Sequence, residues 1–122
     1  MKFPQQWRAG SGVDAPARQV DILPTVLDVL GIDPPAGLDG TSLLPALSCP
    51  DAPRPPAYVT VGGSGFNPKI DALVVGRHKL IHTTRGERAH PRLELYDLVD
   101  DPGEQRDLAP AQPVLAGYLF SR

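Results

Sequence analysis

The sequence predicts a mixed α/β fold in two parts: a helical first part, then a small antiparallel sheet that ends in a helix. Three observations predict it: helical periodicity at 20–32, a proline-rich stretch at 49–56, and short β-prone segments beyond residue 57. The chain has 122 residues, about the size of one small domain. Its 15 prolines and 12 glycines indicate many loops, while Leu, Val, Ile and Phe remain frequent enough to build a core.

The first predicted element is a helix over residues 22–30. Apolar residues recur there with the period of a helix and cover more than half of its circumference. We expect the carboxylate of Asp21 to cap the first turn, where Pro24 is tolerated because first-turn amides have no helical partner. Gly31 is placed to end the helix in the left-handed conformation.

A short second helix and a connector follow. Asp39-Gly40 marks a turn, after which Thr41 or Ser42 is expected to cap a helix over 43–47. Four prolines then fall between residues 48 and 56. Because proline lacks an amide donor and favours extended neighbours, we interpret 49–56 as a semi-rigid connector between two parts of the fold.

Four short strands are predicted beyond the connector, since β-branched and aromatic residues become frequent there. They cover residues 57–61, 70–77, 79–84 and 93–98, with a tight hairpin at Gly76. Residues 100–104 read as a turn, and a last helix is expected to begin near residue 112.

Composition excludes several classes of protein. The net charge is −2 with both signs interspersed, so no basic surface indicates a nucleic-acid partner. No apolar run is long enough for a membrane-spanning helix. The first residues lack the apolar stretch of a signal peptide, so the localisation is left open, with the cytoplasm as the default.

Histidine and cysteine residues are the first candidates for chemistry. His78 and His82 fall on one face of a predicted strand, but no acidic residue stands at a matching offset. We therefore interpret them, with His90, as ordinary surface histidines. The single cysteine, Cys49, excludes an internal disulfide and a multi-cysteine zinc site, and we interpret it as incidental.

Two clusters of charge are the next candidates. An acidic cluster suggests a cation site, but it lacks the spacing of an EF-hand loop and is interrupted by a Pro-Gly turn, so we interpret it as a solvated turn. Four arginines suggest an oxyanion site, because guanidinium groups match tetrahedral oxyanions, but we interpret them as a charged loop. The members are Asp97, Asp100, Asp101 and Glu104, and Arg77, Arg85, Arg88 and Arg92.

Five segments, taken in order, resemble the C-terminal part of the sulfatase family within the alkaline-phosphatase-like superfamily. They are 3–10, 20–32 (VDILPTVLDVLGI), 38–45 (LDGTSLLP), 78–81 (HKLI) and 94–109 (ELYDL, then DPGE and DLA). The resemblance implies a C-terminal fragment of an alkaline-phosphatase-like fold. Residues 1–48 are then the C-terminal edge of the α/β domain, 49–56 the connector, and 57–122 the small antiparallel-sheet subdomain with a truncated terminal helix.

The resemblance also implies a function, the hydrolysis of sulfate esters of small molecules or glycans. Full-length relatives are expected to use a formylglycine, made from Cys or Ser in C-x-P-x-R, beside a divalent cation, Ca²⁺ or Mg²⁺. Cys49-Pro50 does not match that motif, because the proline and arginine of the motif stand at other offsets. No catalytic residue and no metal ligand is therefore carried over, and the chain alone is expected to be inactive. Lys79 and His78 are the candidate substrate-binding residues.

Two alternatives stay open. One is a phosphodiester or phosphonate ester hydrolase on the same scaffold. The other is a non-catalytic interaction module that pairs with a separate catalytic chain, which an exposed apolar face on the 22–30 helix would favour. Whether the chain is split, truncated or an incomplete sequence is left open. In all three cases, self-association or pairing with a catalytic chain is expected.

Overall fold

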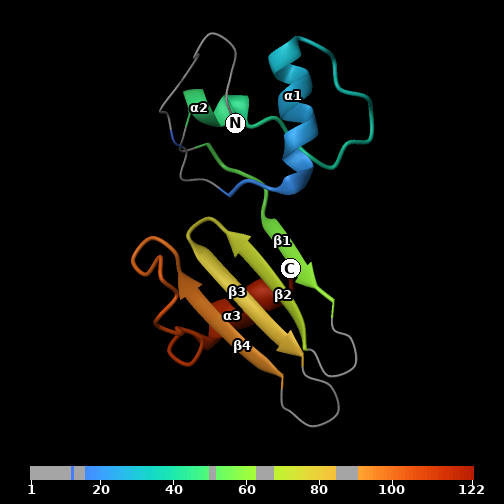
Figure 1. Cartoon of the computed structure of the whole chain (residues 1–122). Coiled ribbons are helices and arrows are strands. Elements are labelled where there is room, and N and C mark those ends of the chain that lie inside the picture. Colours follow the sequence, from blue (N-terminus) through green and yellow to red (C-terminus); the bar gives the residue numbers. More distant parts are fainter. Residues whose placement is uncertain (1–11, 13–15, 50–51, 63–67, 85–90) are drawn as a thin grey trace. The chain divides into compact units, whose positions relative to one another are not determined.

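The computed structural model describes residue 12 and residues 16–49, 52–62, 68–84 and 91–122 (Figure 1). The chain forms two compact units, Met1–Arg54 and Pro55–Arg122, and their division lies within the predicted connector. In the described residues, no helix is long and apolar enough to cross a membrane.

The first unit is helical. A 3-10 helix, η2 (Gln19–Asp21), leads directly into α1 (Ile22–Leu30), and α2 (Leu44–Ser48) follows after a loop. The predicted 22–30 helix is confirmed. Its end is as predicted, because Gly31 has a φ of 66° and its amide donates to the carbonyl of Asp28.

The predicted cap of α1 is wrong. Asp21 directly precedes the helix, but its carboxylate makes no hydrogen bond to the amides of the first turn. Its backbone is already helical, since it is the last residue of η2, and its side chain is bound by residues outside the helix. The cap predicted for the second helix is partly confirmed, because Ser42 Oγ accepts the amide of Leu44, while Thr41 makes no such contact.

The side of α1 that is buried within its own unit is not its apolar stripe. Pro24 and Thr25 are buried, whereas the apolar side chains Ile22, Leu23, Val26 and Leu30 are between 39% and 63% exposed. In this unit α1 packs through Pro24 and Thr25, and its apolar stripe remains exposed.

The second unit contains a four-stranded antiparallel sheet with the order β1-β2-β3-β4 (Figure 1). This confirms the predicted antiparallel sheet. The strands are β1 (Ala57–Val61), β2 (Lys69–Val75), β3 (His78–Thr84) and β4 (Arg92–Asp97). The predicted hairpin is also confirmed: β2 and β3 are joined through Gly76, whose φ of 57° suits a tight two-residue turn.

One helix, α3 (Pro113–Phe120), packs against β3 and β4. The core of this unit is formed by Leu80 and Leu95, which are partners in neighbouring strands, with Ala116 and Leu119 of α3. Since side chains alternate along a strand, Leu80 and its even-numbered neighbours in β3 share the α3 side of the sheet, and the odd-numbered residues lie on the opposite side.

Candidate functional site

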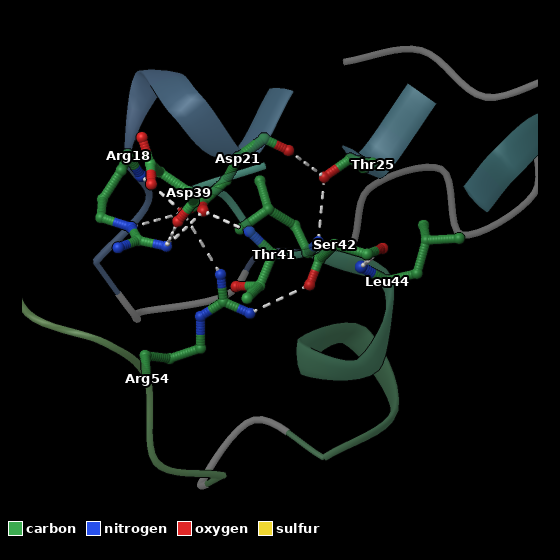
Figure 2. A network of polar contacts seen from close by, with 9 residues as sticks. Arg18, Asp21, Thr25, Asp39, Thr41, Ser42, Leu44 and Arg54 are labelled. Carbon is green, nitrogen blue, oxygen red and sulfur yellow. Dashed lines mark hydrogen bonds and ion pairs between the residues drawn. The ribbon is translucent and has the colours of Figure 1, made fainter. Parts of the chain in front are cut away.

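Among the described residues of the first unit, a network of polar contacts surrounds the buried carboxylate of Asp21 (Figure 2). Arg18 holds it from the preceding turn, with its Nη2 2.7 Å from Oδ1 and its backbone amide 3.0 Å from Oδ2. The amide of Thr41 donates to Oδ1 at 2.9 Å, and Arg54 Nη2 lies 3.5 Å from Oδ2. Asp21 therefore joins residues that are 20 and 33 positions away in the sequence.

The electrostatics of this site favour the ionised carboxylate. Burial by itself raises the pKa of Asp21, because it disfavours the charged form. The hydrogen bonds from Arg18 and from the amide of Thr41 lower the pKa more than burial raises it, and the result is about 2. The carboxylate is thus charged at neutral pH, as a structural ion pair requires, and is a poor general acid or base there.

Thr25 and the loop before α2 complete the site. The buried hydroxyl of Thr25 donates to the carbonyl of Asp21 at 2.6 Å and accepts the amide of Leu43 at 2.9 Å. A Cβ added to Gly40 would lie 1.9 Å from the carbonyl oxygen of Val20, so only glycine fits there. The segments 20–32 and 38–45 both carry the family resemblance, and they are held together by these hydrogen bonds and by the close approach at Gly40.

The two predicted substrate-binding residues do not come together. Lys79 and His78 are neighbours in β3, so their side chains leave opposite sides of the sheet. Lys79 Nζ lies 2.8 Å from both carboxylate oxygens of Glu104, in the turn after β4. His78 lies on the same side of the sheet as Leu80 and is half-buried. The structure thus places Lys79 in an ion pair and separates it from His78.

The predicted acidic cluster is a turn whose charges are mostly paired. Arg77 donates to the carboxylates of Asp97 and Asp100, and the carboxylate of Asp101 accepts the amide of Arg106. These contacts confirm the turn and tie it to the β2–β3 hairpin. Arg77 is therefore part of a hairpin turn and not of a charged loop.

Other members of the predicted clusters differ in their placement. Arg92 forms an ion pair with Glu94, and Arg85, Arg88 and His90 lie outside the described residues. His82 is not a simple surface residue, because its ring packs edge-on against Phe120 with centroids 4.9 Å apart.

The described residues do not fit a resident metal or a formylglycine. Among them, no three or more His, Cys, Asp or Glu side chains gather at one point as a divalent cation would need. Cys49, the free and exposed thiol at the end of α2, has no such partners.

Comparison with known proteins identifies one family. A family model described as "N-sulphoglucosamine sulphohydrolase, C-terminal" matches residues 1–115. Arylsulfatase K of Danio rerio is 32% identical over 111 residues, which cover 87% of this chain and 21% of that protein. The chain therefore spans about a fifth of the length of this curated relative.

Solved structures agree with this match. The structure of BT1596, a 2-O GAG sulfatase, is 30% identical and has a TM-score of 0.58; the similarity covers 80% of this chain and 22% of that one. The structure of Ps i-CgsB has a TM-score of 0.64 at 19% identity, covering 81% of this chain and 21% of that one, and supports the fold alone. The predicted match to the C-terminal region of an alkaline-phosphatase-like fold is confirmed.

Proposed function

This chain belongs to the N-sulphoglucosamine sulphohydrolase C-terminal family of sulfatases, and from this premise we propose that it completes a sulfate-ester hydrolase whose reacting groups lie in another part of the protein. The match over residues 1–115 carries the sulfatase assignment. The exposed apolar side of α1 supports the proposal that this chain completes a larger enzyme, because it offers a surface on which a larger α/β domain can pack.

The substrate class follows from the same premise. We expect a sulfate ester of a small molecule or glycan, bound at a centre that uses a divalent cation, Ca²⁺ or Mg²⁺, and a formylglycine. When bound, the cation would stabilise negative charge on the sulfuryl oxygens. The described residues contribute the framework: the Asp21 site holds α1 to the loop before α2, and the Lys79–Glu104 pair holds β3 to the turn after β4.

The first experiment measures activity directly. Purified chain is assayed with an aryl sulfate and with Ca²⁺ or Mg²⁺. We expect no turnover, because Cys49 does not stand in a C-x-P-x-R motif and no three potential metal ligands gather among the described residues. Co-expression with the rest of a sulfatase-type α/β domain is expected to produce turnover. Activity of the chain alone that disappears in Cys49→Ala would overturn the proposal.

The second experiment tests the candidate substrate-binding residues in that active complex. If Lys79 binds substrate, Lys79→Ala raises KM, whereas Lys69→Ala, a lysine in another ion pair of the same sheet, leaves KM unchanged. His78→Ala is measured separately, because His78 lies on the other side of the sheet. Unchanged kcat/KM in both variants removes the binding role from Lys79 and His78.

Two alternatives are decided by the same material. An active complex that hydrolyses an aryl phosphodiester faster than an aryl sulfate identifies a phosphodiesterase on this scaffold. The exposed apolar side of α1 is also what a non-catalytic interaction module would present. Stable association with a catalytic chain, without any effect of this chain on kcat/KM, supports the non-catalytic interaction module.

A further inference from the structure

A cleft of about 510 Å³ opens on the α3 side of the sheet in the second unit. Its origin is geometric. A helix is about 10 Å wide and strands lie about 4.8 Å apart, so one helix covers only about two strands. Because α3 packs on β3 and β4, the α3 side of β1 and β2 is left open beside the helix. Leu80 and Leu119, both buried, form the apolar floor.

Three neighbouring strands bring polar groups to this cleft. Tyr58 of β1 is the register partner of Leu73, and Asp71 of β2 is the partner of His82 in β3, so all four residues share the α3 side. The hydroxyl of Tyr58 donates to Asp71 Oδ1 at 2.8 Å. Thr60, beside the cleft, donates to the same oxygen. The sequence predicts strands at 57–61 and 70–77, but the cleft itself depends on where α3 lies.

The carboxylate of Asp71 is held in place and charge-balanced. Hydrogen bonds from Thr60, Lys69 and Tyr58 lower its pKa to about 2, and Lys69 Nζ lies 2.9 Å from Oδ2. The hydroxyl hydrogens of Tyr58 and Thr60 are used on Asp71, so their oxygens remain available as acceptors. Arg122, which lines the cleft, adds donors.

Aromatic rings flank these polar groups. Tyr58 is 61% exposed and Phe120 is 56% exposed, and both line the cleft. The ring of His82 packs edge-on against Phe120 and so fixes the inner side of that wall. The faces of aromatic rings carry partial negative charge and attract the polarised C–H groups of a flat, saturated ring. Apolar walls with a few fixed polar groups are typical of small-ligand sites.

We propose that this cleft binds a neutral pyranose ring, an uncharged sugar residue of a glycan. The ring C–H groups pack on Tyr58 and Phe120, and sugar hydroxyls donate to the free acceptor positions of Asp71 and Tyr58 while accepting from Arg122. The cleft does not require a cationic ligand, because Lys69 already balances Asp71. Binding in this cleft needs no sulfate on the ligand and no metal.

The test is a titration of the full ¹⁵N-labelled chain with methyl β-glucopyranoside and methyl α-mannopyranoside, followed by amide chemical shifts. We expect saturable shifts at residues 58–60, 71–73 and 119–122 for at least one of the two sugars, with dissociation constants in the millimolar range, roughly 1–20 mM. Phe120→Ala is expected to weaken binding about fivefold or more, through lost stacking. Asp71→Asn is expected to weaken it as well.

The matched control is Val114→Ala. Val114 lies in the same helix and is 85% exposed, but it does not line the cleft, so its truncation leaves binding unchanged. The proposal is overturned if neither sugar shifts these amides, or if Phe120→Ala and Val114→Ala bind equally well. It is also overturned if benzylamine shifts the same amides more strongly than either sugar, because the cleft would then be a site for aromatic cations. None of these outcomes depends on sulfatase activity.

Discussion

Asp21 has a structural role that a residue-by-residue view of α1 does not suggest. An aspartate before a helix usually caps it, yet here the carboxylate is fully buried and joins Arg18, Thr41 and Arg54. A buried carboxylate persists only where charged partners and amide donors replace water. The residue thus connects α1 to the loop before α2 and to the end of the first unit.

Replacing Asp21 by Asn is expected to destabilise the first unit by about 3–5 kcal/mol, because it leaves the largely buried Arg54 without its carboxylate. Asp28→Asn is the matched control, since Asp28 lies in α1, is exposed, and accepts a hydrogen bond only from Ser42 among the described side chains. Amide hydrogen exchange of residues 25–30 measures the local stability. Equal protection in the two variants contradicts the assignment.

Acidification is expected to remove the stabilising effect of the Asp21 carboxylate. The pKa of Asp21 in the folded protein, about 2, lies below the usual value near 3.9, so its stabilising effect is present above about pH 4 and is lost as the pH falls through 2. The amide of Thr41, which donates to Asp21, is the reporter. Its NMR shift is expected to titrate with a midpoint near 2, and Asp21→Asn should abolish that step. A midpoint near 4 would refute the arrangement.

At the scale of elements, a glycine decides how the loop before α2 meets the start of α1. Gly40 lies against the carbonyl of Val20 with no space for a Cβ, so the two segments approach backbone to backbone. This approach brings the amides of Thr41 and Leu43 to Asp21 and Thr25. The conformational freedom of glycine is secondary here; the close approach is what requires it.

Gly40→Ala is expected to break this contact, because its Cβ would lie 1.9 Å from a backbone oxygen. We expect a loss of more than about 2 kcal/mol, more than for Gly31→Ala, where strain in the left-handed conformation costs roughly 1–2 kcal/mol and nothing lies within 4 Å. Gly12→Ala, also in open space, is the control for a simple methyl addition. Exchange protection of the Thr41 and Leu43 amides gives the ranking, and a Gly40→Ala protein as protected as Gly12→Ala would disprove it.

At the scale of the whole molecule, the main feature is the apolar side of α1, which remains largely exposed among the described residues. Burial of a Val, Leu or Ile side chain stabilises by about 1.5–3 kcal/mol. Ile22, Leu23, Val26 and Leu30 stay largely exposed in the first unit, so they add little to the stability of the chain alone. Such a surface favours association, either with the proposed α/β domain or with a second copy.

The chain alone is therefore expected to self-associate. Size-exclusion chromatography with light scattering should give a mass above 13.1 kDa, and Leu23→Lys with Val26→Glu should shift it towards 13.1 kDa. Val99→Lys is the control, because Val99 is equally apolar and 66% exposed but lies in the turn after β4. A monomer of 13.1 kDa with one sharp thermal transition would show a self-sufficient domain instead.

The sequence by itself determined the elements and the family. Helical periodicity, the frequency of β-branched and aromatic residues and the position of a glycine are local properties of neighbouring residues. They predicted the helix at 22–30, the strands and the Gly76 hairpin, respectively. The ordered motifs predicted the sulfatase resemblance, which the family match over residues 1–115 confirms. Even the division between units falls within the proline-rich stretch that the composition marked.

Only the tertiary structure decided what the polar side chains do. The sequence predicted Asp21 as a helix cap, because capping depends only on neighbouring residues. Its partners Thr41 and Arg54 are distant in the sequence, so no local pattern predicts them. Lys79 forms an ion pair with Glu104, which the turn after β4 brings near, while its role as a substrate ligand stays a prediction. The cleft beside α3 exists because one helix covers half of a four-stranded sheet, and that coverage depends on packing between elements, which no single segment specifies.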